Sequence, residues 1–525
     1  MNPTYYLTTP LYYVNAKPHI GHSYTEIAAD ALARWHRLIG KDVLFLTGTD
    51  EHGQKIEKAA VLAGMTPKEF TDKISLSFKE LWQTLNISYD DFIRTTQDRH
   101  ISAVQAVWKY LYEKNEIYSD TYRGLYCTPC ENFWLESQVL KENDRLLCPD
   151  CKRPVERIEE DNFFLKLSKH QSWLIQYIRD HKGFIMPQTR RNEMLGFLEN
   201  NTLQDLCISR PKSRLTWGIQ SPISDAHVTY VWFDALINYI SALGYGAEDA
   251  KLKKWWPADV HIIGKDILRH HAVYWPILLK ALDLELPKMI FAHGWWVQGG
   301  EKMSKSRGNV VDPVNVVTQY GVDSYRYFLL SEAPFGEDGT FSEEALTDRF
   351  NHDLANDLGN LLYRSLTMCE KYFDGEIPIT SKGVPTPLES SAAQLPGKLA
   401  SFMGVLAFSQ ALQEIWALIN QANKFIEEEA PWKAAKAGDT EKLKVTIINL
   451  IEVLKCIAQA VWPFLPATGE AIWSQLGLKG KPCDVPFKEN MWGFFEKGGK
   501  VVKGAPLFPR IETKDNPPSV AGKKG

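Results

Sequence analysis

The sequence predicts an α/β fold in which a parallel sheet is interrupted by an inserted module and followed by a helical bundle. Three observations predict it. Strand-like and helix-like segments alternate over the first 115 residues, two close cysteine pairs stand in a stretch without this alternation, and apolar residues recur at helical spacing after about residue 350. Alternating strands and helices favour parallel strands joined by crossover helices. The 525 residues leave room for three or four domains.

The first half of the sheet is expected before residue 116. Residues 5–9 form a short β-prone run, and an amphipathic helix pattern begins at Ser23 and ends near Gly40. Residues 43–46 are apolar and indicate a buried strand. Strand, helix and strand in this order predict a Rossmann-like sheet.

The second half of the sheet is expected after an insertion that holds both cysteine pairs. Strand-like runs return at residues 260–263 and 289–291, on either side of a helix expected around 267–282. The two halves of the predicted sheet domain are residues 1–115 and 226–295, and the inserted connective domain is 116–225. A lysine-loop region (296–350), a helical domain (351–511) and a flexible tail (512–525) are expected to follow.

Two amphipathic stripes predict the helical domain. Apolar residues spaced three and four apart are typical of helices that pack into a bundle. The stripes are Phe408, Leu412, Ile415, Ile419, Ala422 and Ile426, and then Leu443, Ile447, Leu450, Leu454, Ile457 and Val461.

Composition narrows the class of protein. The net charge is only −4, so bulk charge gives no support for a non-specific nucleic-acid binder. We find no secretory signal at the start and no apolar run of the roughly 18 residues that a membrane helix needs. Paired and scattered cysteines suit a reducing compartment, so we expect a cytoplasmic protein without a membrane partner. We also expect a monomer.

A nucleotide site without a glycine-rich phosphate loop is expected after the first strand. His19, Gly21 and His22 directly precede a helix, whose N-terminal N–H groups favour anions. The imidazoles would add donors for phosphate oxygens, and Gly21 would let a flat base approach the backbone. Two polar histidines in an ordinary turn are the alternative for this motif alone.

A second motif lies in residues 299–309, which are rich in Gly, Ser and cations. Lys302 and Lys305 can offer point charges to a polyphosphate, and flanking glycines leave the loop free to close on developing charge. A solvated basic turn is the alternative if the segment is taken alone.

Four cysteines predict one structural zinc ion per chain. Two CxxC pairs are separated by 17 residues, a spacing that brings four thiolates into a tetrahedron. The alternatives are two disulfides or four free thiols. The predicted ligands are Cys127, Cys130, Cys148 and Cys151.

Together the first two motifs resemble the class I aminoacyl-tRNA synthetases. HIGH at 19–22 and KMSKS at 302–306 form the signature pair of that class. Residues 8–15, 47–53, 231–239 and 264–267 resemble the methionyl-tRNA synthetase family, and this resemblance covers nearly the whole chain. The insertion is too short for the editing domain of the related leucine, isoleucine and valine enzymes.

The resemblance implies an enzyme that activates L-methionine with ATP and loads it onto tRNA(Met) for initiation and elongation. His19, His22, Lys302 and Lys305 would be catalytic, and Mg²⁺ would accompany ATP. ATP would bind at His19, Gly21, His22, Asp266 and Lys305. Methionine would bind at Leu11, Tyr13, Asp50, Trp232, Ala235, Leu236, Tyr239 and His271, where aromatic walls suit a polarizable thioether.

The helical domain would read the CAU anticodon of tRNA(Met) through Asn360, Arg364 and Trp432, and the lysine-loop region would contact its stem. Asn360 and Arg364 are four residues apart and so share a helix face, and Trp432 could stack on an unstacked base. One position departs from the family: many members have Phe where this sequence has His270, which makes that pocket wall more polar or simply stacks as Phe would.

Two other classes of protein remain open at this stage. One is a small nucleotidylyltransferase with a related histidine motif, but those chains are far shorter. The other is a non-catalytic tRNA-binding or regulatory protein descended from a synthetase, in which the catalytic motifs would be eroded, whereas here both are intact.

Overall fold

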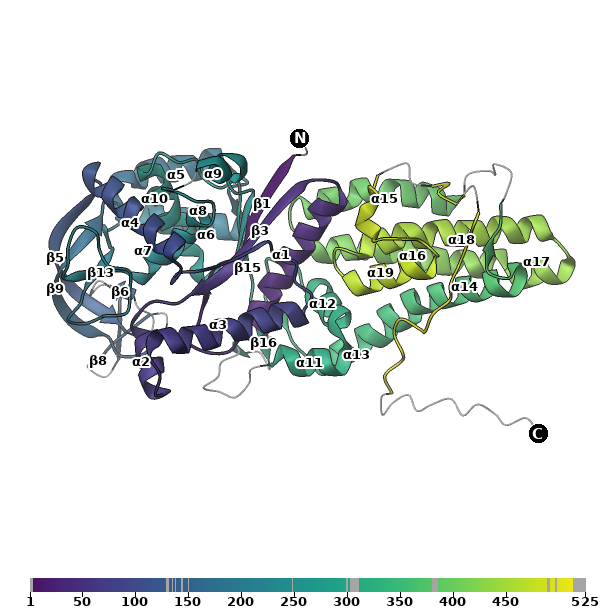
Figure 1. Cartoon of the computed structure of the whole chain (residues 1–525), viewed down its shortest axis with the longest axis horizontal. Helices are drawn as coiled ribbons and strands as arrows, with labels where there is room; N and C mark the ends of the chain where they lie inside the picture. Colours follow the sequence, from purple (N-terminus) through teal and green to yellow (C-terminus); the bar gives the residue numbers. More distant parts are fainter. Residues whose placement is uncertain are drawn as a thin grey trace. The chain divides into compact units, whose positions relative to one another are not determined.

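The structure, a computed structural model, describes most of the chain and divides into two compact units (Figure 1). The first unit comprises residues 3–29 and 43–294, and the second comprises 30–42 and the chain from Trp295 onward. The described residues are 3–128, 132–134, 136, 138–142, 145–149, 151–247, 249–298, 301–302, 311–379, 386–488, 492–495 and 498–512.

The first unit is built on a seven-stranded sheet, in which β1 and β14, β10 and β15, β14 and β15, β2 and β3, and β3 and β4 pair in parallel. The strand order is β10-β15-β14-β1-β3-β2, with β4 also paired to β3. Strands from the start of the chain therefore meet strands from its middle where β1 lies beside β14. The strands are β1 (Thr4–Thr8), β2 (Tyr12–Tyr13), β3 (Asp42–Asp50), β4 (Asp91–Arg94), β10 (Ile185–Met186), β14 (Val260–Gly264) and β15 (Ile290–His293).

Helices connect and cover these strands, and local sequence sets where they begin. In α3, Thr66 and Glu69 form a capping box, and Pro67 occupies the first turn, where its missing N–H costs nothing. The helices are α1 (Ile20–Leu38), α2 (Gln54–Leu62), α3 (Pro67–Thr84), α4 (Asp98–Glu113), α5 (Gln171–Asp180), α6 (Gln188–Asn200), α7 (Val231–Leu236), α8 (Asn238–Ser241), α9 (Asp249–Trp255) and α10 (Trp275–Ala281).

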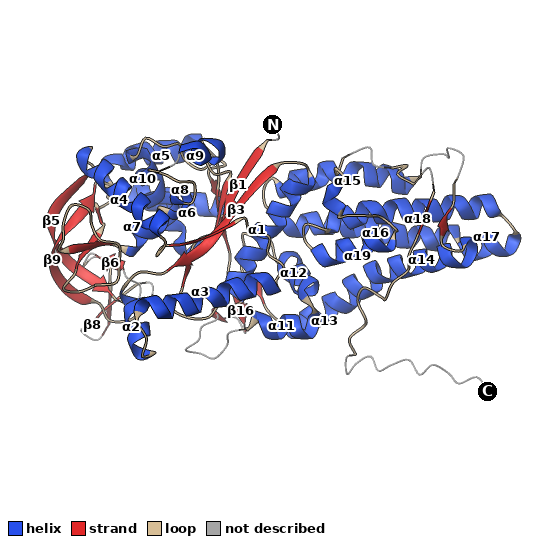
Figure 2. Ribbon diagram, in the orientation of Figure 1, coloured by secondary structure: helices blue, strands red, loops and turns tan. Residues whose placement is uncertain are grey.

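The inserted stretch is more regular than its sequence indicates. Two long strands pair antiparallel from Ile117↔Leu165 to Tyr126↔Glu156, and Figure 2 shows them as the curved red strands of the first unit. Exposure alternates along the second of them, where Ile158, Glu160 and Asn162 are buried and the residue before each is exposed, so the sheet has one solvent-exposed face. The antiparallel strands are β5 (Ile117–Cys127), β6 (Asn132–Trp134), β9 (Glu156–Leu165) and β11 (Leu206–Cys207), with two small pairs, β7 (Leu140–Glu142) with β8 (Arg145–Leu147) and β12 (Ser209–Pro211) with β13 (His227–Thr229).

One apolar core unites the parallel sheet with the helices of the first unit. Trp108 of α4, Tyr239 of α8 and Trp275 of α10 are almost fully buried in it, together with Tyr6 of β1 and Ile263 of β14. Large aromatic side chains contribute most of the buried apolar area in such a core. The core fixes the ends of β1 and β14 against the helices that follow them.

The second unit is mainly helical. Helices α14, α16 and α18 contact one another and run side by side in Figure 1. Their apolar stripes face the interior of the bundle. The unit contains β16 (Trp296–Gln298), β17 (Glu301–Lys302), β18 (Gly339–Thr340), α11 (Pro313–Tyr320), α12 (Val322–Ser331), α13 (Glu343–Arg349), a π-helical segment (Phe350–Gly359), α14 (Asn360–Phe373), β19 (Glu376–Ile377), α15 (Pro387–Met403), α16 (Phe408–Glu429), α17 (Pro431–Ala437), α18 (Thr440–Val461), α19 (Pro466–Gln475) and β20 (Gly499–Lys500).

The predicted fold class, a parallel-sheet domain followed by helices, is confirmed, and one predicted element is more complex than expected. Residues 267–282 form a π-helical turn at His270–Tyr274 before α10, instead of one regular helix. Pro276, in the first turn of α10, has no backbone N–H to donate to the preceding turn. π-helical turns of this kind are common at functional sites. Among the described helices none is both long and apolar enough to span a bilayer.

Candidate functional site

Several predicted site residues follow the carboxyl ends of neighbouring parallel strands. Leu11 and Tyr13 follow β1, Asp50 ends β3, and Asp266 follows β14. In open α/β sheets, ligands bind at this edge, where the strand order reverses. Here the reversal lies between β1 and β14, so the topology gathers these side chains at the expected position for a ligand.

The loop after β1 is held against the end of β3. Tyr13 pairs with Asp50 in the parallel ladder of β2 and β3, so an aromatic ring and a carboxylate stand side by side. Asp50 is only 7% exposed. A Cβ at Gly48 would lie 2.9 Å from the side chain of Leu11 and 1.9 Å from the carbonyl oxygen of Ile93. Only glycine therefore allows this close approach.

The two motif histidines stack on each other at the start of α1, with ring centroids 3.9 Å apart. Nδ1 of His22 accepts from the backbone N–H of His19, and Nδ1 of His19 accepts from the N–H of Gly21, both at 3.1 Å. A neutral imidazole whose Nδ1 accepts carries its hydrogen on Nε2. The local backbone therefore fixes both rings as Nε2–H donors.

Gly21 has a second role that sequence reasoning did not anticipate. A Cβ at this position would lie 3.0 Å from Cε1 and 3.2 Å from Nδ1 of His19. The glycine therefore makes room for the His19 ring as well as for any ligand.

Polar contacts that the sequence did not reveal anchor the start of α1 to the sheet edge. The hydroxyl of Thr25 lies 2.8 Å from Nε2 of His293, the last residue of β15. Nδ1 of His293 faces the carbonyl oxygen of Gly294 at 2.7 Å, so Nδ1 carries the hydrogen and Nε2 accepts. Thr9 donates to the buried carboxylate of Glu26 at 3.0 Å. No local motif indicates these partners, because most are far apart in the sequence.

Residues 231–241 and the π-helical turn form an aromatic wall. Ala235, Leu236 and Tyr239 are buried, and Trp232 is half-buried. The hydroxyl of Tyr239 lies 2.7 Å from Nε2 of His271, whose Nδ1 lies 3.0 Å from the carbonyl oxygen of Ile267. His271 therefore carries its hydrogen on Nδ1 and accepts from Tyr239.

Burial keeps His271 neutral. Desolvation lowers its pKa to about 4, against weaker opposing effects of the Ile267 carbonyl and the Asp266 carboxylate. At neutral pH the wall therefore offers an uncharged imidazole bonded to a phenol.

A buried carboxylate behind this wall was also missed by sequence reasoning. Asp234 of α7 accepts from His52 and from His100, at 2.7 Å in each case, and His100 also bonds to Ser241 at 2.8 Å. Desolvation opposes ionisation of Asp234, but the charge of His52 and hydrogen bonds from His100 and His52 hold its pKa below the usual value. The network joins the segment after Asp50 to the helix that carries Trp232.

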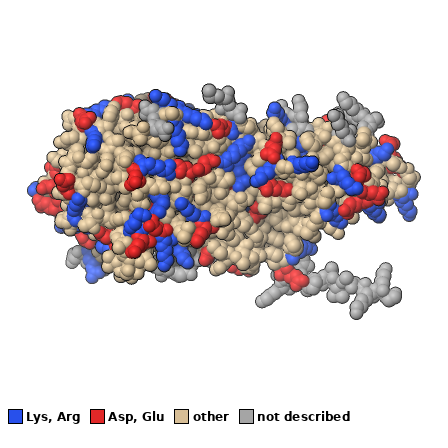
Figure 3. All heavy atoms as spheres, in the orientation of Figure 1, with Lys and Arg blue, Asp and Glu red and all other residues tan. Residues whose placement is uncertain are grey.

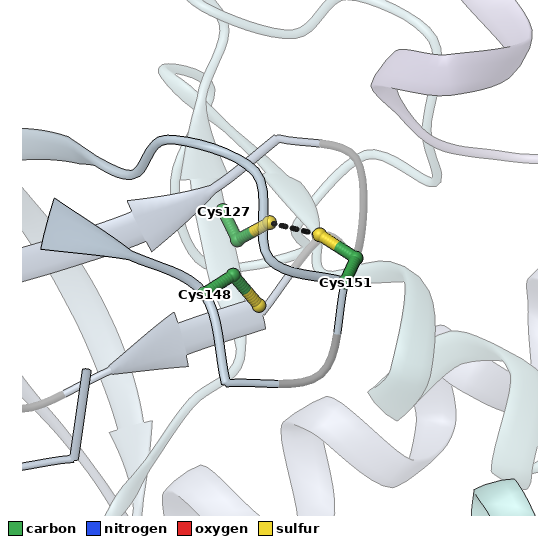
Figure 4. A group of neighbouring side chains, drawn as sticks. All are labelled: Cys127, Cys148 and Cys151. Atoms are coloured by element: carbon green, nitrogen blue, oxygen red, sulfur yellow. Dashed lines mark hydrogen bonds between the residues drawn. The ribbon is translucent and has the colours of Figure 1, made fainter. Parts of the chain in front are cut away.

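The three described cysteines of the two CxxC pairs lie together (Figure 4). Ligand atoms of Cys127, Cys148 and Cys151 all lie within 4.8 Å of one another, and Sγ of Cys127 is 3.5 Å from Sγ of Cys151. Sulfurs in a tetrahedral zinc site are about 3.8 Å apart, given Zn–S bonds of about 2.3 Å. The three thiols therefore fit zinc.

Among the described residues, the apolar core of this part of the module is small. Its separate apolar cluster comprises five buried residues: Leu125, Cys127, Trp134, Val139 and Cys148. A core of this size is too small to fold by itself, which favours a structural role for a metal.

The predicted anticodon residues lie in the helical unit. Asn360 and Arg364 are on α14, and the guanidinium of Arg364 pairs with Glu427 of α16 at 2.6 Å. Trp432, at the start of α17, is 41% exposed, which is unusual for so large an apolar side chain. Lys and Arg side chains are interspersed with Asp and Glu over the described part of the face in Figure 3.

Some predicted residues lie outside the described part of the structure. Lys305 and Cys130 are among them, and of Lys302 only the backbone is described, as the end of β17.

Comparisons with known proteins agree along nearly the whole chain. The family model for class I tRNA synthetases (M) matches residues 5–366, and the model for the anticodon-binding domain of methionyl-tRNA ligase matches 388–517. The methionine–tRNA ligase of Clostridium perfringens is 51% identical over 517 residues, which cover 97% of this chain and 78% of that protein. That of Thermotoga maritima is 45% identical over 515 residues, 97% of this chain and 81% of that protein.

A solved structure is also similar. Mycobacterium tuberculosis methionyl-tRNA synthetase in complex with methionyl-adenylate is 40% identical, with a TM-score of 0.91. The match covers 97% of this chain and all of that chain.

Proposed function

Because this chain belongs to the methionyl-tRNA synthetase family, we propose that it activates L-methionine with ATP and transfers it to tRNA(Met) for initiation and elongation. The carrying observation is the extended match to methionine–tRNA ligases, 51% identical over 97% of the chain. The gathering of Tyr13, Asp50 and Asp266 at one sheet edge supports it. Methionine-dependent exchange of pyrophosphate into ATP, followed by charging of tRNA(Met), tests the proposal. If the unaltered protein showed neither activity, the proposal would be refuted.

The proposed ATP site uses the donors at the start of α1. His19 and His22 would direct their Nε2–H groups to phosphate oxygens, while Gly21 leaves room for the base. Asp266 would accept from the ribose hydroxyls. Lys302 and Lys305 would add positive charge, and Mg²⁺ bound with ATP would neutralise part of the phosphate charge.

The proposed reaction depends on positioning and charge stabilisation. The methionine carboxylate attacks the α-phosphorus in line, and pyrophosphate leaves with the bonding electron pair. The acyl group of the adenylate then passes to the 2′-OH of the terminal adenosine of tRNA, and AMP leaves. The similar mycobacterial structure contains methionyl-adenylate, the intermediate that such a reaction forms.

The proposed methionine pocket combines Asp50 with an aromatic wall. Asp50 would pair with the substrate ammonium. Polarizable sulfur is attracted to aromatic rings by about 0.3–1.5 kcal/mol, which suits walls of Tyr13, Trp232 and Tyr239. Leu11, Ala235, Leu236 and His271 would complete the pocket.

Methionine affinity should be constant from pH 6 to 8 and weaken below about pH 5. His271, with a pKa of about 4, stays neutral in the upper range and loses its acceptor for Tyr239 only when it is protonated. Folding stability should begin to fall earlier, because the unfolded chain takes up the proton near the ordinary pKa of about 6.5. Equilibrium dialysis with labelled methionine measures the profile; a midpoint near pH 6.5 for binding would contradict it.

We propose that zinc is bound by Cys127, Cys130, Cys148 and Cys151. The geometry of the three described thiols and the small core around them support this. When bound, the ion would cross-link the module and take no part in the reaction.

Replacing Cys148 with serine should reduce bound zinc from one ion per chain to almost none. Serine is a poor zinc ligand at neutral pH, and the remaining three thiolates would not retain the ion through dialysis against a chelator. Elemental analysis measures the ratio, with Cys483→Ser as the matched control because Cys483 lies in the helical unit. Equal zinc content in both variants would exclude Cys148 as a ligand.

The proposed tRNA contacts lie on the helical unit. Trp432 would stack on an anticodon base, and Arg364 would exchange its surface pair with Glu427 for a contact to the RNA. Exposed ion pairs contribute little stability, so this exchange costs little.

Replacing Trp432 with alanine should raise KM for tRNA(Met) about 10- to 100-fold and leave pyrophosphate exchange unchanged. A stacked base contributes about 1–3 kcal/mol, and the exchange reaction needs no tRNA. Steady-state charging assays measure the effect, with Leu62→Ala as a control that removes another exposed apolar side chain. An unchanged KM would remove Trp432 from the anticodon site.

The predicted domain limits, cytoplasmic location and monomeric state remain proposals. No disulfide joins any two of the seven described cysteines, which suits a reducing compartment. Light scattering at micromolar concentration would test the monomeric state.

A further inference from the structure

His270, the residue that departs from the family pattern, lies directly against the proposed pocket wall. Its ring stacks on Trp232 with centroids 3.7 Å apart and planes 19° apart, and it meets Tyr274 edge-on at 5.3 Å. The His270 side chain is only 9% exposed. A phenylalanine could make the same aromatic contacts, so stacking alone does not explain an imidazole here.

In the neighbouring side chains of His271 and His261, both ring nitrogens have hydrogen-bond partners. His271 bonds to Tyr239 and to the carbonyl of Ile267. Nε2 of His261 accepts from Trp275 at 3.1 Å, and its Nδ1 lies 2.8 Å from the hydroxyl of Thr8. Each of these rings therefore uses its one hydrogen and its one lone pair.

His270 differs from both. Neither of its ring nitrogens has a hydrogen-bond partner within the described part of the chain. Burial lowers its pKa well below the usual value, so the ring is neutral and carries one N–H donor and one acceptor. A buried polar group without a partner destabilises the protein, a cost that an apolar residue would avoid.

An unsatisfied buried group in a native protein calls for an explanation, and a functional role is one. His270 stacks on Trp232, which belongs to the proposed methionine pocket. The side chain of the bound amino acid is therefore the first partner to consider for its ring nitrogens. Methionine carries a weak acceptor, the thioether sulfur, at the end of its side chain. Its isostere norleucine has a methylene there and accepts nothing.

We propose, building on the function proposed above, that His270 determines specificity by donating its ring N–H to the heteroatom in the side chain of the bound amino acid. It distinguishes a thioether from a methylene, and it favours an analogue with a stronger acceptor, such as the sulfoxide of methionine.

The test compares three amino acids of increasing acceptor strength: norleucine, methionine and methionine sulfoxide. In His270→Phe, kcat/KM for pyrophosphate exchange should be unchanged with norleucine and fall about 2- to 10-fold with methionine, the range expected for a neutral hydrogen bond. With the sulfoxide it should fall further. The thermal midpoint should stay or rise, because the variant removes unsatisfied groups.

Two further variants serve as matched controls. Asparagine and glutamine place an amide near the positions of Nδ1 and Nε2, so His270→Asn or His270→Gln should restore discrimination and identify the nitrogen that donates. Equal losses for all three amino acids in His270→Phe, or no loss, would overturn the inference. Absence of methionine-dependent exchange in the unaltered enzyme would instead refute the proposed function.

Discussion

Replacing Lys305 with alanine is expected to lower methionine-dependent pyrophosphate exchange by about 10²- to 10³-fold while methionine still binds. Negative charge moves onto the leaving pyrophosphate as the α-phosphorus is attacked, and a positioned cation stabilises that charge more in the transition state than in the ground state. Removal of one such electrostatic group typically costs this much in rate. The effect should therefore appear in kcat.

The measurement separates chemistry from folding. Exchange kinetics give kcat and KM for ATP, and equilibrium dialysis gives the affinity for methionine. Lys58→Ala is the matched control, because it removes one positive charge from an exposed position on α2. If Lys305→Ala exchanged as fast as Lys58→Ala, Lys305 would have no part in the reaction.

Much of the fold could be predicted because the decisive signals are local. The strand-like runs at 43–46 and 260–263 lie within β3 and β14, since strands that are buried on both faces consist mostly of apolar residues. The stripes of α16 and α18 also coincide with their helices, because period and length agree there. The strands of the insertion were harder to predict. Charged residues on the solvent-exposed side of β5 and β9 interrupt the apolar runs that would indicate a strand.

The candidate site was predictable only in part. Motif residues such as His19 and Asp50 stand in short recognisable segments, but the residues that orient them do not. Asp234 meets His52 across 182 positions of the sequence, and no periodicity connects them. The roles of His19 and His22 as Nε2–H donors also depend on backbone N–H directions, which a sequence does not specify.

Replacing Asp30 with alanine is expected to destabilise the helical unit by about 3–5 kcal/mol. The carboxylate of Asp30 is fully buried and binds two cations, Arg34 at 2.8 Å and Arg326 at 2.6 Å. Arg326 is itself fully buried and also donates to the carbonyl oxygens of Phe464 and Pro463. Removal of one partner from a buried charge network leaves the other charge uncompensated, which accounts for the size of the effect.

Denaturant unfolding followed by circular dichroism measures this loss. Glu332 and Arg349 provide the control, because Glu332→Ala breaks a partly exposed pair of 3.2 Å and should cost no more than about 1 kcal/mol. The double variant Asp30→Ala with Arg326→Met should recover part of the loss, because a methionine fills the space without a charge. If Asp30→Ala were no more harmful than Glu332→Ala, the buried network would not stabilise the bundle. If the double variant were as unstable as the sum of its single changes, the cost would come from lost packing and not from the uncompensated charge.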